Sequence, residues 1–144
     1  MRTLNVIWAI VLVAVALLAG GCSLASGGSD ESVEATHRRW VDALVAGDPN
    51  EVDRLSADMD YHDVFVYQTL SRMEGFVQRG AGERGGAFKT AEDRGVRPAG
   101  GERYGFSAWV FASNTICYRA TLTPQKAGWR VRAWNEVKPA ECGG

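Results

Sequence analysis

One stretch near the C-terminus of this 144-residue chain decides its fold, 102-ERYGFSAWVFASNTICYRATLTPQKAGWRVRAWNEV-137. Apolar residues recur at every second position in three runs of this stretch, a period that is typical of half-buried β-strands. Two turn-forming segments, Ser113-Asn114 and Pro124-Gln125-Lys126-Ala127-Gly128, separate the runs. We therefore predict three consecutive antiparallel strands joined by short turns.

The same alternation predicts which side chains share a face of the sheet. The side chains expected to face a layer of helices are Tyr104, Phe106, Ala108, Val110, Ile116, Tyr118, Ala120, Leu122, Trp129, Val131 and Ala133. The opposite face would present Trp109, Phe111, Cys117, Arg119, Arg130, Arg132 and Trp134. Because tryptophan and arginine are enriched in binding hot spots, the candidate binding residues for an anionic ligand or a protein partner are Trp109, Arg119, Arg130, Arg132 and Trp134. In the simplest register Arg119 lies near Arg132; alternatively, these side chains only cover one another beneath the tail that ends at Cys142.

Helices are expected before the strands. Helical spacing of apolar residues predicts a first helix over 31–46, and Asp48-Pro49-Asn50-Glu51 is a typical start of a second one. Residues 60–79 also show helical spacing, and we favour a helix there over a strand at 61–67 followed by a shorter helix. The glycine-rich segment 80–101 is expected to be a loop, or a loop with one short element inside it. This order indicates an α+β domain in which two or three helices pack on a curved antiparallel sheet.

The N-terminus reads as an export segment. Residues 6–19 are an unbroken apolar run, which is short for a membrane span of roughly 20 residues and fits the core of a signal peptide. The string Leu18-Ala19-Gly20-Gly21-Cys22 resembles a bacterial lipobox. That resemblance implies a signal peptide over 1–21, acyl chains on Cys22, a flexible tether over 22–30 and a domain over 31–144. The protein would then be anchored to the cell membrane, outside the cytoplasm; the alternatives are an uncleaved single span and an ordinary secretory signal.

The odd number of cysteines agrees with the lipoprotein interpretation. If Cys22 carries lipid, Cys117 and Cys142 remain, and export places them where disulfides persist. We expect these two cysteines to form a disulfide, with two unpaired buried thiols as the alternative. They have no neighbouring His or Cys at ligand spacing, so no metal site is expected.

Two motifs of the domain resemble NTF2-like (cystatin-like) α+β domains. They are Trp40-x-x-Ala43-Leu44-x-x-Gly47-Asp48 near the start and Gly128-Trp129-Arg130-Val131 near the end. The resemblance implies helices that close over a curved sheet, but the family ranges from enzymes to ligand binders and assembly modules. Some of its enzymes use an Asp/His pair in a cone-shaped pocket. The candidates for such a pair in this chain are His62, Asp63 and His37.

The expected function is therefore that of an exported, lipid-anchored, non-catalytic binding or assembly module of the cell envelope. The alternative is an NTF2-like pocket enzyme or small-molecule binder that uses His62, Asp63 or His37. A net charge of −1 gives no reason to expect nucleic acid. The GxGxxG match at residues 80–85 lacks a strand before it and a helix after it, so no nucleotide cofactor is expected. A filled or an open space between sheet and helices would distinguish the two functions.

Overall fold

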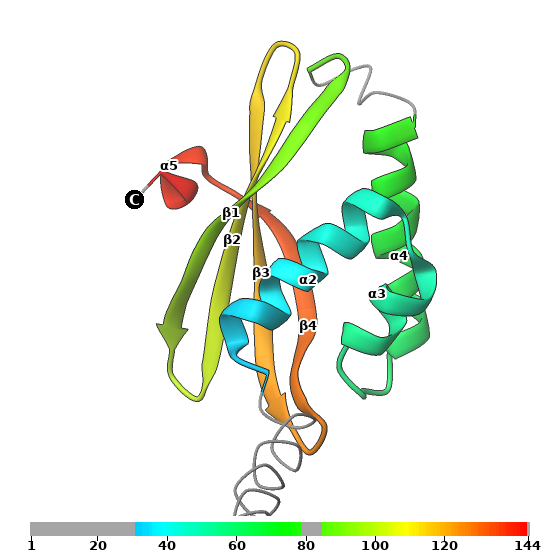
Figure 1. Ribbon diagram of the computed structural model, residues 1–144, viewed down its shortest axis with the longest axis vertical. Helices are drawn as coiled ribbons and strands as arrows, with labels where there is room; N and C mark the ends of the chain where they lie inside the picture. The colour runs from blue at the N-terminus through cyan, green and yellow to red at the C-terminus, as the bar shows by residue number, and fades with distance from the viewer. Residues whose placement is uncertain (1–30, 79–84, 144) are drawn as a thin grey trace, which may run out of the picture. The chain divides into compact units, whose positions relative to one another are not determined.

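The computed structural model describes residues 31–78 and 85–143, which lie in the compact unit Glu31–Gly144. The predicted signal peptide, lipobox and tether lie outside the described residues, as do residues 80–84 of the GxGxxG match. The elements are shown in Figure 1 and are, in chain order, α2 (Val33–Ala46), α3 (Pro49–Leu55), α4 (His62–Met73) with its π-helical continuation η1 (Glu74–Gln78), β1 (Phe88–Ala99), β2 (Glu102–Phe111), β3 (Thr115–Gln125), β4 (Gly128–Val137) and α5 (Pro139–Cys142). None of the described helices is both long and apolar enough to span a membrane.

The four strands form one antiparallel sheet in the order β1-β2-β3-β4, and Val131 of the outermost strand β4 also forms an isolated parallel bridge with Ser56. The predicted α+β class and the three C-terminal strands are confirmed. The expectation of a loop over 80–101 is wrong, because β1 occupies twelve residues of it. Most β1 side chains are exposed and Gly95 has a φ of 87°. The strand forms through backbone pairing with β2, which local apolar alternation does not reveal.

Local sequence accounts for the helices. The Ser32 hydroxyl accepts a hydrogen bond from the Ala35 N–H, and the Asp48 carboxylate accepts from the amides of Asn50 and Glu51. Gly47 ends α2 in the left-handed conformation, which favours glycine. The helix favoured over 60–79 is confirmed as α4 and η1, and no strand forms at 61–67.

The helices α2, α3 and α4 lie on one side of the sheet (Figure 1), and we call the sheet face toward them the inner face. Its core includes Trp40, Leu44, Leu55, Trp109, Phe111, Tyr118, Leu122, Val131 and Trp134. The side-chain orientation predicted for β3 is confirmed. The orientation predicted for β2 is wrong, since Trp109 and Phe111 face inward, whereas Phe106 and Ala108 belong to a second cluster with the two cysteines. Both faces of β2 carry apolar residues, so alternation did not determine its orientation.

A bulge in β4 explains why Trp134 lies on the inner face, which is also contrary to the prediction. Thr121 pairs with Ala133 and Leu122 pairs with Val131, which leaves Arg132 as an extra residue. The bulge keeps Val131 on the inner face and also places Trp134 there. Arg119 pairs with Asn135, so the predicted proximity of Arg119 and Arg132 through the register is wrong.

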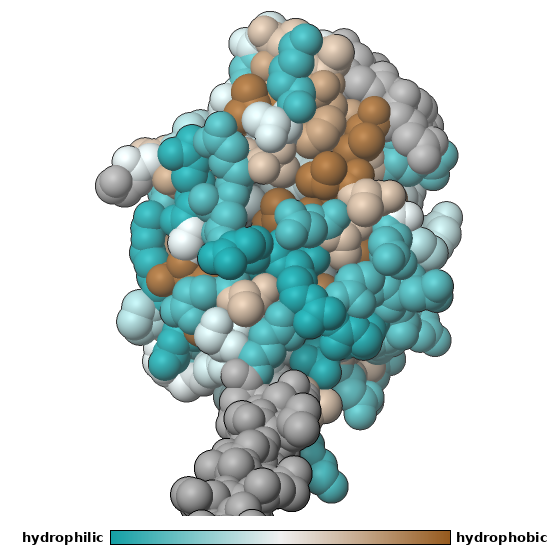
Figure 2. All heavy atoms as spheres, viewed as in Figure 1, coloured by the Kyte–Doolittle hydropathy of each residue, from teal (hydrophilic) through white to brown (hydrophobic). Residues whose placement is uncertain are grey.

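Apolar side chains are also exposed on the helical layer. Figure 2 shows hydrophobic residues gathered above the C-terminal half of α2. The large hydrophobic side chains that remain exposed are Val45, Tyr61, Val64, Tyr67 and Val77. Three of them lie on or beside α4, which buries only Thr69 and Met73 completely.

Candidate functional site

The sheet face away from the helices, which we call the outer face, carries arginines stacked on aromatic rings. The guanidinium carbon of Arg97 lies 4.4 Å from the ring centre of Phe106, and that of Arg119 lies 4.3 Å from the ring centre of Tyr104. Arg119 is 3.9 Å from Glu141, a loose ion pair. Stacking on a ring holds the cation in place while part of it stays accessible to an anion.

Part of the outer face is covered by the C-terminal tail. Cys117 on β3 and Cys142 on α5 form a pair at disulfide distance, with 5.8 Å between their Cα atoms, as the sequence predicted. The pair packs with Phe106 and Ala108, which are only 4% and 1% exposed. The tail therefore covers the part of the outer face around Phe106 and reaches Arg119, which lies 3.9 Å from Glu141 of α5.

Arg132 and Arg130 have local partners. The Arg132 guanidinium donates to both oxygens of Glu102, an interaction that lowers the pKa of Glu102. Arg130 donates to the carbonyls of Trp129 and Ala127 at 2.7 Å and 3.1 Å, and so stabilises the turn between β3 and β4. These contacts are structural, and Arg97 and Arg119 are the outer-face cations held mainly by aromatic rings.

The two candidate tryptophans are not binding residues of the outer face. Trp109 is fully buried and Trp134 is 4% exposed, and their rings lie edge to face at 5.8 Å. The Trp109 indole donates to the Ser107 hydroxyl at 3.0 Å. Our prediction that both side chains lie on the face away from the helices is wrong, for the reasons given above: the two-sided β2 and the bulge in β4.

His37 is a buried residue that pairs with Asp93 of β1. Its Nδ1 lies 3.1 Å from an Asp93 oxygen, and the hydrogen bond from His37 is the main reason why the pKa of Asp93 is lowered. A Cβ atom at Gly105 would lie 2.2 Å from the imidazole, so only glycine leaves room for this ring. The imidazole is completely buried and therefore cannot meet a substrate at the surface.

His62 pairs with Asp53, not with Asp63. Its Nδ1 lies 2.8 Å from the Ala57 carbonyl and its Nε2 lies 2.9 Å from an Asp53 oxygen. Both partners are acceptors, so both ring nitrogens are placed to donate, as in an imidazolium. The hydrogen bond to Ala57, followed by that to Asp53, raises the pKa of His62. His62 thus ties the start of α4 to α3, and neither nitrogen is left to act as a base.

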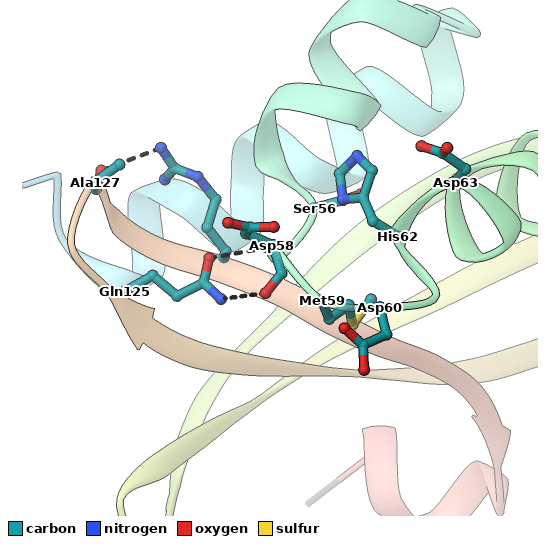
Figure 3. Close-up of a pocket in the computed structure, with 9 residues that line it drawn as sticks. Ser56, Asp58, Met59, Asp60, His62, Asp63, Gln125 and Ala127 are labelled. Atoms are coloured by element: carbon teal, nitrogen blue, oxygen red, sulfur yellow. Dashed lines mark hydrogen bonds between the residues drawn. The ribbon is translucent and has the colours of Figure 1, made fainter.

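A cleft of about 450 Å³ opens beside His62 and Asp63, between the α3–α4 connection and the β3–β4 turn (Figure 3). Gln125 closes one side of it through two hydrogen bonds with the backbone of Asp58, at 3.0 Å and 3.1 Å. The carboxylates that line the cleft are those of Asp58, Asp60 and Asp63. No group of three potential ligands suited to a metal ion occurs in 31–78 and 85–143.

Aromatic rings occupy the central part of the space between the sheet and the helices. Trp40 stacks on Phe65 with ring centres 5.9 Å apart, and Tyr118 stacks on Trp134 at 4.3 Å. The 450 Å³ cleft lies at the edge of the domain, so it is not a pocket between these two layers.

The raised pKa of His62 predicts a pH dependence of stability. A group with a raised folded-state pKa stabilises fully below its unfolded value of about 6.5, and this contribution is lost as the pH rises through the folded value. We expect stabilisation of up to about 1 kcal/mol at pH 5.5 that is lost by pH 8.5, since the pair is partly exposed. His62→Gln should remove this component in urea unfolding measured at both pH values. Equal pH dependence in the variant and the wild type would contradict the assignment.

Sequence reasoning missed Asp93, Gly105 and Arg97. Asp93 had a usable signal, because Asp-x-Gly predicts a turn, and its carboxylate indeed accepts from the Gly95 amide at 2.8 Å. Gly105 and Arg97 gave no signal, because their partners are far away in the chain.

The chain was compared with protein-family models, with curated proteins and with solved structures. No family model, no curated protein and no solved structure matches it.

Proposed function

We propose that the chain is an exported lipoprotein, anchored to the cell membrane through acyl chains on Cys22, whose domain is a non-catalytic binding module outside the cytoplasm. One combination carries this proposal: Cys117 and Cys142 lie at disulfide distance in a chain whose first 22 residues resemble an export signal with a lipobox. Disulfides persist in oxidising compartments and are rare in the cytosol. The tether over 22–30 would hold the domain away from the bilayer.

The geometry of the histidines supports a non-catalytic role. His37 is buried and bonded to Asp93, and both nitrogens of His62 are occupied. A general base needs a free nitrogen within reach of the substrate. The order of the elements, helices first and an antiparallel sheet last, is consistent with an NTF2-like relationship, which we include in the proposal.

The part of the outer face around Arg97 and Arg119 is the proposed binding surface. Arg97 and Arg119 present cations stacked on aromatic rings, a combination found in protein-binding hot spots. We infer an envelope protein that contributes a negatively charged group. The cleft beside His62 supports a second candidate, a binder of small molecules, since it provides about 450 Å³ of space.

The Cys22→Ala variant tests the proposal. We expect the variant to lose metabolic acyl labelling and to leave the membrane fraction, because one cysteine thioether carries the lipid. Ser23→Ala is the matched control and should keep both. Unchanged labelling of Cys22→Ala would disprove the anchor. Cross-linking in cells, with Arg97→Gln/Arg119→Gln compared with Arg94→Gln, then tests the binding surface, and equal recovery of partners from both would disprove it.

A further inference from the structure

A groove of about 230 Å³ lies between α4 and the edge strand β4, and it shares no lining residue with the cleft beside His62. Ten residues line it: Tyr61, Val64, Phe65, Gln68, Thr69, Arg72, Arg132, Ala133, Trp134 and Asn135. The set contains two arginines and no carboxylate. The groove at this edge of the sheet is therefore cationic, although the protein has more acidic than basic side chains.

Arg72 is the accessible cation of this α4–β4 groove. Its guanidinium carbon lies 5.4 Å from the ring centre of Trp134 and 5.8 Å from that of Tyr118. One nitrogen, Nη1, donates to the Trp134 carbonyl at 3.1 Å. No carboxylate within the described ranges pairs with Arg72, whereas Arg132 is already held by Glu102. Two rings and one hydrogen bond fix the plane of Arg72 and leave other N–H groups available.

The remaining lining fits an amphipathic ligand. Val64 and Phe65 supply an apolar wall, and Val64 is 56% exposed at its rim. The Trp134 indole nitrogen is buried with no hydrogen-bond partner in the described part of the chain, an expensive condition for a donor. The Gln68 amide adds another donor beside Arg72.

We propose that the α4–β4 groove binds a small organic carboxylate with an apolar body. The carboxylate pairs with Arg72, whose planar guanidinium matches two carboxylate oxygens. The apolar body lies against Val64 and Phe65. Because the groove is smaller than the 300–1,000 Å³ typical of drug-sized ligands, it takes a fragment-sized molecule. The fixed plane of Arg72 lowers the entropy cost of binding. This site does not depend on the proposed function, because it uses different residues.

The test uses the full-length protein in detergent, with 3-phenylpropionate as the probe and its neutral amide as the matched ligand. The readout is the indole N–H signal of Trp134 in proton–nitrogen NMR spectra. We expect a saturable shift with the carboxylate and roughly tenfold weaker binding of the amide, about 1.4 kcal/mol. No saturable shift at millimolar carboxylate, or equal binding of the amide, would overturn the proposal.

Variants separate binding from folding. Val64→Asp places a negative charge at the rim of the groove. This charge repels the carboxylate of the ligand and should weaken its binding at least about tenfold. Tyr67→Asp is the matched control, because it puts the same charge on the same helix at a 73% exposed position outside the lining. It should bind like the wild type. Arg72→Gln should also lose binding while its circular dichroism stays unchanged. Equal affinities of Val64→Asp and Tyr67→Asp would refute the site even if Arg72→Gln fails to fold.

Discussion

Replacing Trp109 with Ala is expected to lower the free energy of unfolding by about 3–5 kcal/mol. Trp109 is completely buried, and its ring contacts Trp134 and Phe88 at centroid distances of 5.8 Å and 5.7 Å. Truncation removes these contacts and leaves the Ser107 hydroxyl without the indole donor that it now accepts from. Urea unfolding followed by circular dichroism measures the change.

Tyr67→Ala is the matched control for Trp109→Ala. Tyr67 is also aromatic but 73% exposed on α4, so its loss should change stability by less than about 0.5 kcal/mol. If Trp109→Ala costs no more than Tyr67→Ala, Trp109 does not lie in the core. The orientation of β2 would then be the one that apolar alternation had predicted.

Removing both Cys117 and Cys142 by substitution with Ala is expected to cost about 3–4 kcal/mol. The bond links β3 to α5 across a sequence separation of 25, and its loss restores chain entropy to the unfolded state. The helix α5 has only four residues, too few to be stable without this link. Urea unfolding of oxidised protein, compared with the double variant, gives the difference.

A reductant provides the control for the cysteine variant. Dithiothreitol should lower the stability of the wild type to that of Cys117→Ala/Cys142→Ala and should leave the double variant unchanged. Two free thiols in the domain of the oxidised wild type, with no response to the reductant, would show that the cysteines are unpaired.

Which face of a strand points to the core could be predicted only where the two faces of that strand differ in polarity. In β3, the large apolar residues Ile116 and Tyr118 alternate with Cys117 and Arg119, so the face toward the main core is evident, although Cys117 is also buried, in the cluster beneath α5. In β2, Trp109 lies on one face and Phe106 on the other, and both are buried. The apolar content of β2 serves two clusters, the main core and the one beneath α5, and no local pattern distinguishes them.

The candidate sites were also only partly predictable, because the local sequence did not reveal the partners of their side chains. The sequence pointed to His62 and His37 as rare titratable residues, but their partners, Asp53 and Asp93, were not predicted. Asp93 lies 56 residues from His37, on a strand that was expected to be a loop. Arg72 was not singled out either, because its role depends on Trp134, which the bulge in β4 turns inward.

The sequence by itself determined the α+β class, the three helical segments and the last three strands, and it predicted the pairing of Cys117 with Cys142. The helices and strands follow from local period and helix caps, which act within a few residues. Only the tertiary structure decided the fourth strand, the faces of β2 and β4 and the surroundings of Arg72. They depend on pairing between distant segments and on one extra residue at Arg132, and a shift of one residue reverses every side chain that follows.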